Sequence, residues 1–117
     1  MPLILAIDQS TSATKAVLFD EQGTVVDRAS RDHAQHCPAP QRVEHDADEI
    51  WANVQAVAAA VVSRNADRLH DIAGVSLANQ RETFVVFDRA TGVPLRRAIV
   101  WQDRRGDAVC RIMAAQG

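Results

Sequence analysis

A chain of 117 residues is long enough for one modest domain that buries roughly 65% of the surface its unfolded form exposes. Apolar residues make up 47% and charged residues 24% of the sequence, which is ordinary for a globular protein. The 13 basic and 15 acidic residues give a net charge of −2, with no basic block, so the charge does not favour nucleic acid as a partner.

The sequence also lacks the features of an exported or membrane-bound chain. The first apolar run is interrupted by Asp8 and has no basic leader, so we expect neither a signal peptide nor a membrane span. Cys37 and Cys110 are far apart and follow no metal-binding spacing. Two free thiols are typical of a reducing compartment, and we therefore expect a cytoplasmic protein.

Two apolar runs, at residues 3–8 and 15–20, are separated by a short polar segment, which predicts a β-hairpin. The polar segment is rich in hydroxyl groups, which belong to Ser10, Thr11, Ser12 and Thr14. Consecutive N–H groups in a turn, with hydroxyls beside them, form a concave site for phosphate oxygens. The carboxylate of Asp8 at its entrance suits Mg²⁺, and Lys15 follows the turn. The alternative is an ordinary polar turn, because turns collect Ser, Thr and Asp.

A tight turn at residues 21–23 and a further strand-like run at residues 24–30 follow the hairpin. Turns this short leave no room for a crossover, so the three runs are expected to form an antiparallel meander. The third strand loses its alternation toward Arg31, which favours a place at the edge of the sheet.

Residues 33–43 show no periodicity and contain two prolines, which indicates an irregular connection. Four residues in and near this segment are of types that bind zinc: His33, His36, Cys37 and His45. Their spacing matches no common zinc motif, so we interpret them as surface residues of a loop.

Asp46, with Glu49 three residues later, predicts the start of a helix that runs to about Asn65. Its apolar residues recur at helical spacing and are expected to cover a sheet: Ile50, Trp51, Val54, Val57, Ala58, Val61 and Val62. Residues 71–78 then predict a buried strand, parallel to the first strand because a helix connects them. The carboxyl ends of both strands, at residues 8–10 and 79–82, then share the edge where ligands bind in open α/β sheets.

Arg81 and Glu82 lie at this predicted edge. Arginine offers a planar fork of donors and glutamate offers two acceptor oxygens, and together they match a vicinal diol. The alternative is that both side chains point to solvent. Residues 84–88 and 98–101 predict a second hairpin, and residues 106–116 predict a final helix. Trp101 either belongs to the core or offers a flat apolar wall to a substrate.

The segment from Asp8 to Lys15 resembles the first phosphate motif of the sugar-kinase, Hsp70 and actin superfamily, in which a hairpin turn holds nucleotide phosphates. The whole chain resembles one family, the FGGY carbohydrate kinases, and within it the members that phosphorylate glycerol. The segments that carry this resemblance are residues 5–11, 43–46 with 49–51, 79–83, 88–94 and 98–105. The sequence departs from the family pattern at Ser10, usually Gly, and at Gln41 and Arg42, usually Gly and Trp.

The resemblance implies an α/β fold of the ribonuclease-H-like kind, with a mixed sheet, of which residues 1–117 form the amino-terminal part of the first kinase domain. It implies ATP and Mg²⁺ as cofactors and a small polyol or sugar as substrate. The nucleotide site is then expected to contain Asp8, Ser10, Thr11, Ser12, Ala13 and Lys15, with Asp8 on the metal side. Arg81, Glu82 and Trp101 are expected to bind the polyol.

In this family the catalytic base, the second phosphate loop and the adenosine pocket lie beyond the part that these residues resemble. Two functional classes stay open: the amino-terminal piece of an ATP-dependent kinase, or a non-catalytic remnant of the same scaffold. We expect the chain alone to be inactive. Because the incomplete domain leaves apolar surface uncovered, we also expect the isolated chain to self-associate or to be only marginally stable.

Overall fold

A computed structural model describes all 117 residues and divides them into two compact units. The first unit comprises residues 1–33 and 48–80, and the second comprises residues 34–47 and 81–117. Six strands, two α-helices and one 3₁₀ helix build the two units.

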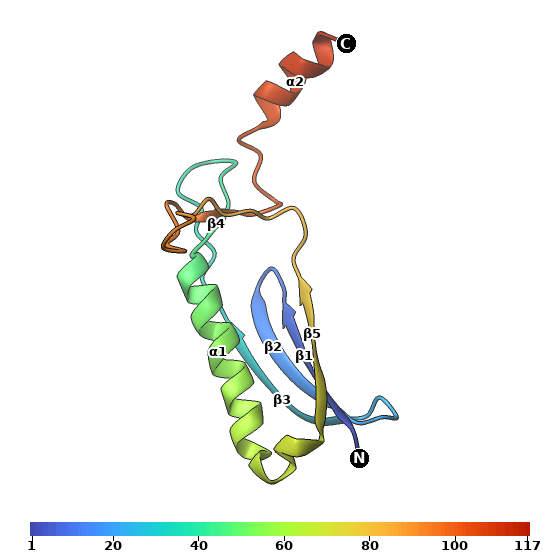
Figure 1. Cartoon of the computed structure of the whole chain (residues 1–117). Coiled ribbons are helices and arrows are strands. Elements are labelled where there is room, and N and C mark those ends of the chain that lie inside the picture. Colours follow the sequence, from blue (N-terminus) through green and yellow to red (C-terminus); the bar gives the residue numbers. More distant parts are fainter. The chain divides into compact units, whose positions relative to one another are not determined.

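A four-stranded mixed sheet with strand order β3-β2-β1-β5 forms the first unit (Figure 1). The strands β1 (Leu3–Gln9), β2 (Ala13–Phe19) and β3 (Val25–Asp32) form an antiparallel meander, with β3 at one edge. Strand β5 (Ile72–Asn79) pairs with β1 in parallel. The predicted meander, edge strand and parallel strand are therefore confirmed, as is the α/β fold class with its mixed sheet.

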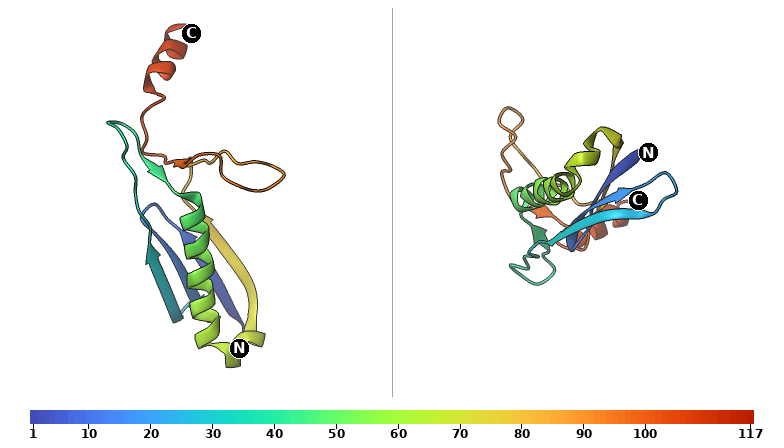
Figure 2. Two further views of the ribbon diagram at one scale, coloured as in Figure 1. Left: turned by 90° about the vertical axis from the view of Figure 1, so that its left-hand side faces the viewer. Right: turned by 90° about the horizontal axis from the view of Figure 1, so that it is seen from below.

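Helix α1 (Ala47–Arg64) lies along one face of this sheet, and a 3₁₀ helix, η1 (Ala66–Asp71), leads from it into β5 (Figure 2). Alternate residues of β1 and β2 point toward the helix and form the core with it: Leu3, Leu5, Ile7, Ala16, Leu18, Val57 and Val61. The predicted crossover helix is confirmed, and Val54, Ala58 and Val62 pack against this core as expected.

Two positions of α1 differ from the predicted apolar face. Trp51 is 61% exposed, because it lies about 120° around the helix from Val57. Asn53 takes a buried position instead, and its side-chain Nδ2 donates to the backbone oxygen of Asp32 at 3.2 Å. This hydrogen bond satisfies the buried amide and joins the helix to the end of β3.

Strand β5 is not buried, contrary to the prediction. Val75 is 69% exposed and Leu77 is 70% exposed, although their partners in the register, Leu5 and Ile7, are buried. The reason is that β5 is an edge strand, and the core consists of residues from β1, β2 and α1 with only Ile72 of β5 packed against it.

The second unit contains the two-residue strands β4 (Glu44–His45) and β6 (Ala98–Ile99), which pair antiparallel. The predicted strand at residues 84–88 is only partly correct. Isolated bridges join Phe84 to Ile99 and Phe87 to Pro94, so this segment folds back as expected but forms no continuous ladder. The predicted turn between them is present, and the Asp88 carboxylate accepts hydrogen bonds from the backbone of residues 90 and 91 at 2.9 and 2.8 Å.

Helix α2 (Asp107–Ala115) is present as predicted, and none of its residues is buried. The assignment of His45 to a loop surface is wrong: it lies in β4 and is fully buried, because β4 pairs with β6. His36 is half-buried, whereas Cys37 and Cys110 are exposed free thiols. Neither α-helix has the length and apolar character needed to span a membrane.

An ion pair fastens the carboxyl end of α1 to β3. Arg64 donates from Nε and Nη2 to the two carboxylate oxygens of Asp27, both at 3.0 Å, and Asn65 donates to the same carboxylate at 2.8 Å. The hydrogen bonds from Arg64 are the main reason why the pKa of Asp27 falls from 3.8 to about 2.

Because the pKa of Asp27 is lower in the folded state, its pair with Arg64 stabilises the fold above pH 3.8, and this contribution is lost as the pH falls toward 2. We predict that Arg64→Gln returns the pKa of Asp27 toward 3.8 and removes this part of the acid sensitivity. An NMR titration of the Asp27 carboxyl carbon measures the shift. Arg68→Gln is the control, because Arg68 faces Asp71 instead. An Asp27 pKa that is equally low in both variants would contradict the assignment.

Candidate functional site

The turn between β1 and β2 is closed by Ser10. Its backbone N–H and its hydroxyl both donate to the backbone oxygen of Ala13, at 2.9 and 2.8 Å. The φ of Ser10 is negative, as it is for every non-glycine residue of the chain except Gln41 and Glu82. The side chain at this position is therefore accommodated without backbone strain, and its hydroxyl contributes to the shape of the turn.

Every carbonyl oxygen of the turn is held by a protein donor. Gln9 Nε2 donates to the oxygen of Ser10 at 2.8 Å, and the backbone N–H of His33 donates to that of Ser12 at 3.2 Å. His33 Nε2 lies 2.8 Å from the oxygen of Thr11, and since a carbonyl only accepts, Nε2 carries the hydrogen. An unengaged carbonyl oxygen would repel an anion, so this arrangement favours an anion at the turn.

His33 is a residue of this site that the sequence did not reveal. It was expected to be one of several surface residues of a loop, but it is half-buried directly after β3. The pairing of Ala13 with Asp32 brings it beside the turn. Only the register of β2 with β3 carries this information, and no local pattern indicates it.

Asp8 and Lys15 lie opposite each other on neighbouring strands. The neighbouring pair, Ile7 and Ala16, is buried against α1, so Asp8 and Lys15 lie on the other face of the sheet. No ion pair joins the two charged groups, and each is available to a ligand. Lys15 also lines a pocket of about 380 Å³ over β2 and β3, together with Arg28 and Ser30. The structure thus places a carboxylate and an ammonium group next to the hydroxyl-rich turn.

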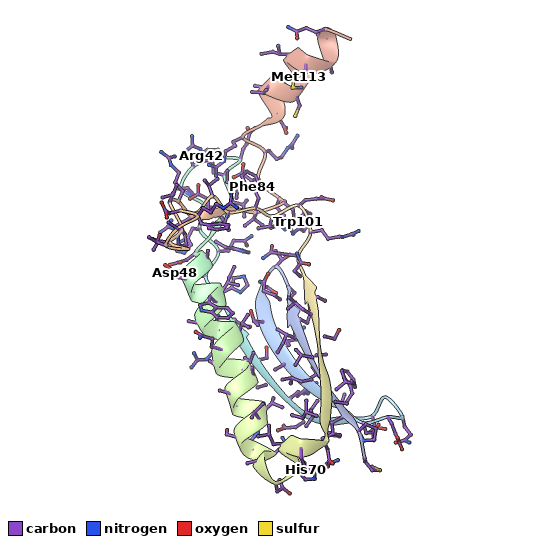
Figure 3. All side chains as sticks on the ribbon, viewed as in Figure 1. Arg42, Asp48, His70, Phe84, Trp101 and Met113 are labelled. Atoms are coloured by element: carbon purple, nitrogen blue, oxygen red, sulfur yellow. The ribbon has the colours of Figure 1, made fainter.

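In the second unit, Thr83 links the Arg81-Glu82 pair to Trp101. Its Oγ1 accepts a hydrogen bond from the backbone N–H of Trp101 at 3.1 Å, and the bridge between Phe84 and Ile99 continues the contact. Trp101 is 51% exposed, which excludes the alternative that it belongs to the core (Figure 3).

The backbone at Glu82 is unusual. Its φ of 66° lies in the left-handed region, which a residue with a long side chain rarely adopts. Such strain is found preferentially at binding and catalytic sites, because the surrounding structure must hold it in place. Arg81 and Glu82 are both exposed and do not pair with each other. Their donors and acceptors therefore stay open.

An ion-pair network fixes the segment that follows Trp101. The Asp103 side chain is 2% exposed, accepts from the Val43 backbone N–H at 2.7 Å and pairs with Arg105 at 2.7 Å. Arg105 also pairs with Glu44 at 2.7 Å. The hydrogen bonds from Arg105 hold the pKa of Asp103 well below its usual range, and the two carboxylates raise the pKa of Arg105. No local sequence pattern indicates this network, because its partners are far apart in the chain.

Gln41, a position that is usually Gly in the resembling family, has a φ of 68°. Glycine adopts this left-handed conformation at little cost, which explains the family pattern in physical terms. The oxygen of Gln41 accepts from the Arg104 backbone N–H at 2.8 Å and so holds the two loops together despite the substitution.

The mixed sheet, the crossover helix and the hydroxyl-rich turn between β1 and β2 define the class of α/β proteins that includes the sugar kinases. Within this class, residues 3–117 match the N-terminal domain of the FGGY family of carbohydrate kinases. The chain belongs to that family.

Individual relatives support the same assignment. A glycerol kinase from Rhodospirillum rubrum is 47% identical over 117 residues, which is all of this chain and 24% of the relative. A glycerol kinase from Bacillus velezensis is 45% identical over 97% of this chain and 23% of the relative. The crystal structure of Plasmodium falciparum glycerol kinase with ADP superposes with a TM-score of 0.92 at 35% identity, covering 100% of this chain and 24% of that one. The chain thus spans about a quarter of the length of these relatives.

The Asp103 network yields a prediction about the second unit. Asp103→Ala leaves Arg105 without its main partner and the Val43 N–H without its acceptor, so it should destabilise the fold by about 2 kcal/mol or more. Amide hydrogen exchange at Val43 should also accelerate. Urea unfolding and exchange measured by NMR provide the two readouts.

Asp107→Ala is the matched control, because Asp107 forms a more exposed ion pair with Arg104. It should cost less than about 1 kcal/mol and leave the exchange at Val43 unchanged. Equal effects of the two substitutions would show that the network does not hold these loops.

Proposed function

We propose that this chain is part of an ATP-dependent kinase that phosphorylates a hydroxyl group of a polyol, with glycerol as the first candidate, and that it forms the amino-terminal part of that enzyme's first domain. The observation that carries this proposal is the turn between β1 and β2, whose carbonyl oxygens are all engaged by protein donors. The similarity to glycerol kinases along the whole chain supports the choice of substrate.

On the nucleotide side, we assign the β- and γ-phosphates to the turn. Ser10 shapes the turn, because its N–H and its hydroxyl both donate to the oxygen of Ala13. The backbone and hydroxyl groups of Thr11 and Ser12, with the backbone of Ala13, bind the phosphate oxygens, and Lys15 neutralises part of their charge. His33 keeps the turn in shape through its two hydrogen bonds.

Asp8 is the residue that we assign to Mg²⁺. No group of three or more potential metal ligands is found in the structure, but Mg²⁺ is usually held by one or two carboxylates together with phosphate oxygens and water. The single carboxylate of Asp8 beside the turn fits that donor set. When bound, Mg²⁺ offsets the charge that develops on the transferred phosphoryl group.

On the polyol side, we assign Arg81 and Glu82 to the hydroxyl groups of the substrate. Each hydroxyl both donates and accepts, and the guanidinium and carboxylate groups supply the two complementary functions. Trp101, held by Thr83, offers its exposed ring to the carbon chain of the substrate. The backbone strain at Glu82 supports this role, because it orients a side chain that has no other partner.

We further propose that the 117-residue chain by itself does not turn over ATP and polyol. Phosphoryl transfer needs a base for the acceptor hydroxyl, and Asp8, the carboxylate beside the turn, serves the metal instead. The isolated chain is also proposed to self-associate, since Val75 and Leu77 expose apolar surface on β5.

Separate substitutions in the full-length enzyme test the two assignments. Arg81→Ala and Glu82→Ala should each weaken glycerol binding by about 2 kcal/mol and so raise the KM for glycerol, with little change in the KM for ATP. Thr11→Val and Lys15→Ala should have the opposite pattern, because a phosphate contact is a charge-assisted hydrogen bond. Steady-state kinetics with each substrate varied in turn measures both constants.

Arg89→Ala serves as the control, because Arg89 is an exposed arginine in the turn of the same unit. It should leave both constants unchanged. If the Arg81 and Glu82 variants affect ATP and glycerol equally, their assignment to the polyol is wrong. If none of the four variants affects either substrate, the chain serves as a non-catalytic scaffold.

A further inference from the structure

A small pocket in the second unit gathers positive charge. Its volume is about 120 Å³, and four arginines line it: Arg42, Arg96, Arg97 and Arg105. One carboxylate, that of Glu44, lies among them. Because the whole chain carries a net charge of −2, this excess of cations is a local feature. None of the residues assigned to nucleotide or polyol lines this pocket.

Three of these arginines are not neutralised by the protein. Arg105 pairs with Glu44 and Asp103, each at 2.7 Å, whereas Arg42, Arg96 and Arg97 form no ion pair and no side-chain hydrogen bond. Other arginines of the chain do find partners, as Arg64 does with Asp27. Guanidinium groups gathered around one pocket repel each other, and an anion between them removes that repulsion.

The backbone holds Arg42 in place from both sides. The oxygen of Gln41 accepts from the Arg104 N–H at 2.8 Å, and the oxygen of Val43 accepts from the Val100 N–H at 3.0 Å. The Val43 N–H is bound by Asp103 as well. Arg42 is therefore presented by a loop that is fixed before any ligand arrives, which lowers the entropic cost of binding.

Backbone hydrogen bonds also hold Arg96 and Arg97 in place from both sides. Before them, the Leu95 N–H donates to the oxygen of Val86 at 2.9 Å, and after them Ala98 begins β6 and pairs with β4. Phe84, Val86 and Ile99 line the rest of the pocket, so apolar side chains line it together with the arginines. Phe84 and Val86 are each 55% exposed, so their apolar surface is open to the organic part of a ligand.

We propose that this pocket is a binding site for a phosphate dianion, either free phosphate or the phosphate group of a monoester. Guanidinium groups match phosphate oxygens with paired hydrogen bonds, and a dianion balances three open arginines better than a carboxylate does. The size of the pocket supports a small ligand: about 120 Å³ corresponds to roughly four water molecules, well below the volume of sites for nucleotide-sized ligands.

Titration calorimetry of the full-length protein at low salt tests this proposal with inorganic phosphate, phenyl phosphate and acetate as probes. The double variant Arg96→Gln/Arg97→Gln should bind inorganic phosphate at least about tenfold more weakly than the wild type, because two charged hydrogen-bond donors are lost. Binding by the wild type should weaken as salt is added. Arg89→Gln and Arg111→Gln change exposed arginines outside the pocket and should leave the affinity unaltered.

The probes also separate the sources of the phosphate group. Tighter binding of phenyl phosphate than of inorganic phosphate indicates an ester whose organic part contacts Phe84 and Val86, whereas equal affinity indicates free phosphate. Acetate that binds as tightly as phosphate would overturn the proposal, as would unchanged phosphate affinity in the double variant. A phosphate signal lost in Lys15→Ala but kept in the arginine variant would assign the anion to the turn after β1 and also overturn it.

Discussion

The parallel pairing of β5 with β1 is the constraint on which the rest of the first unit depends. Ile72 is the residue of β5 that packs against the core, so a slip of β5 by one residue along β1 would turn Ile72 to the other face of the sheet. The pairing continues to the end of both strands, where the Gln80 N–H donates to the oxygen of Gln9 at 2.9 Å. The end of β5 is thereby fixed beside the start of the turn, and Arg81 follows Gln80 in the chain.

Local patterns predicted the features that depend on periodicity and connection length. The alternation in β1 and β2, the short turns and the helical spacing of Val57 and Val61 were sufficient for the strand order and the crossover. They failed where tertiary contacts decide the outcome. Trp51 was predicted to be a core residue because the local sequence does not determine which face of α1 is turned toward the sheet. Val75 and Leu77 are exposed because β5 is an edge strand that α1 does not cover at these residues.

In the candidate site, too, local patterns predicted some residues, whereas others depend on tertiary contacts. The sequence directly shows the hydroxyl groups of the hairpin turn. It also shows the Arg-Glu pair that follows an apolar strand. His33 and Asp103 act through partners more than 20 residues away, namely Thr11 and Val43, and become visible only once the strands are paired. These residues position groups that are proposed to touch the ligands, and the fold contributes to function mainly through such support.

The most direct measurement is the response of the backbone amides of Thr11 and Ser12 to nucleotide, recorded by NMR on full-length protein labelled with ¹⁵N at threonine and serine. If the turn receives the terminal phosphates, ADP with Mg²⁺ should shift both amide signals strongly, while AMP, which lacks the β-phosphate, should shift them little. Equal responses to ADP and AMP, or unchanged signals at both residues while ADP binds elsewhere, would contradict the assignment of the turn to phosphate.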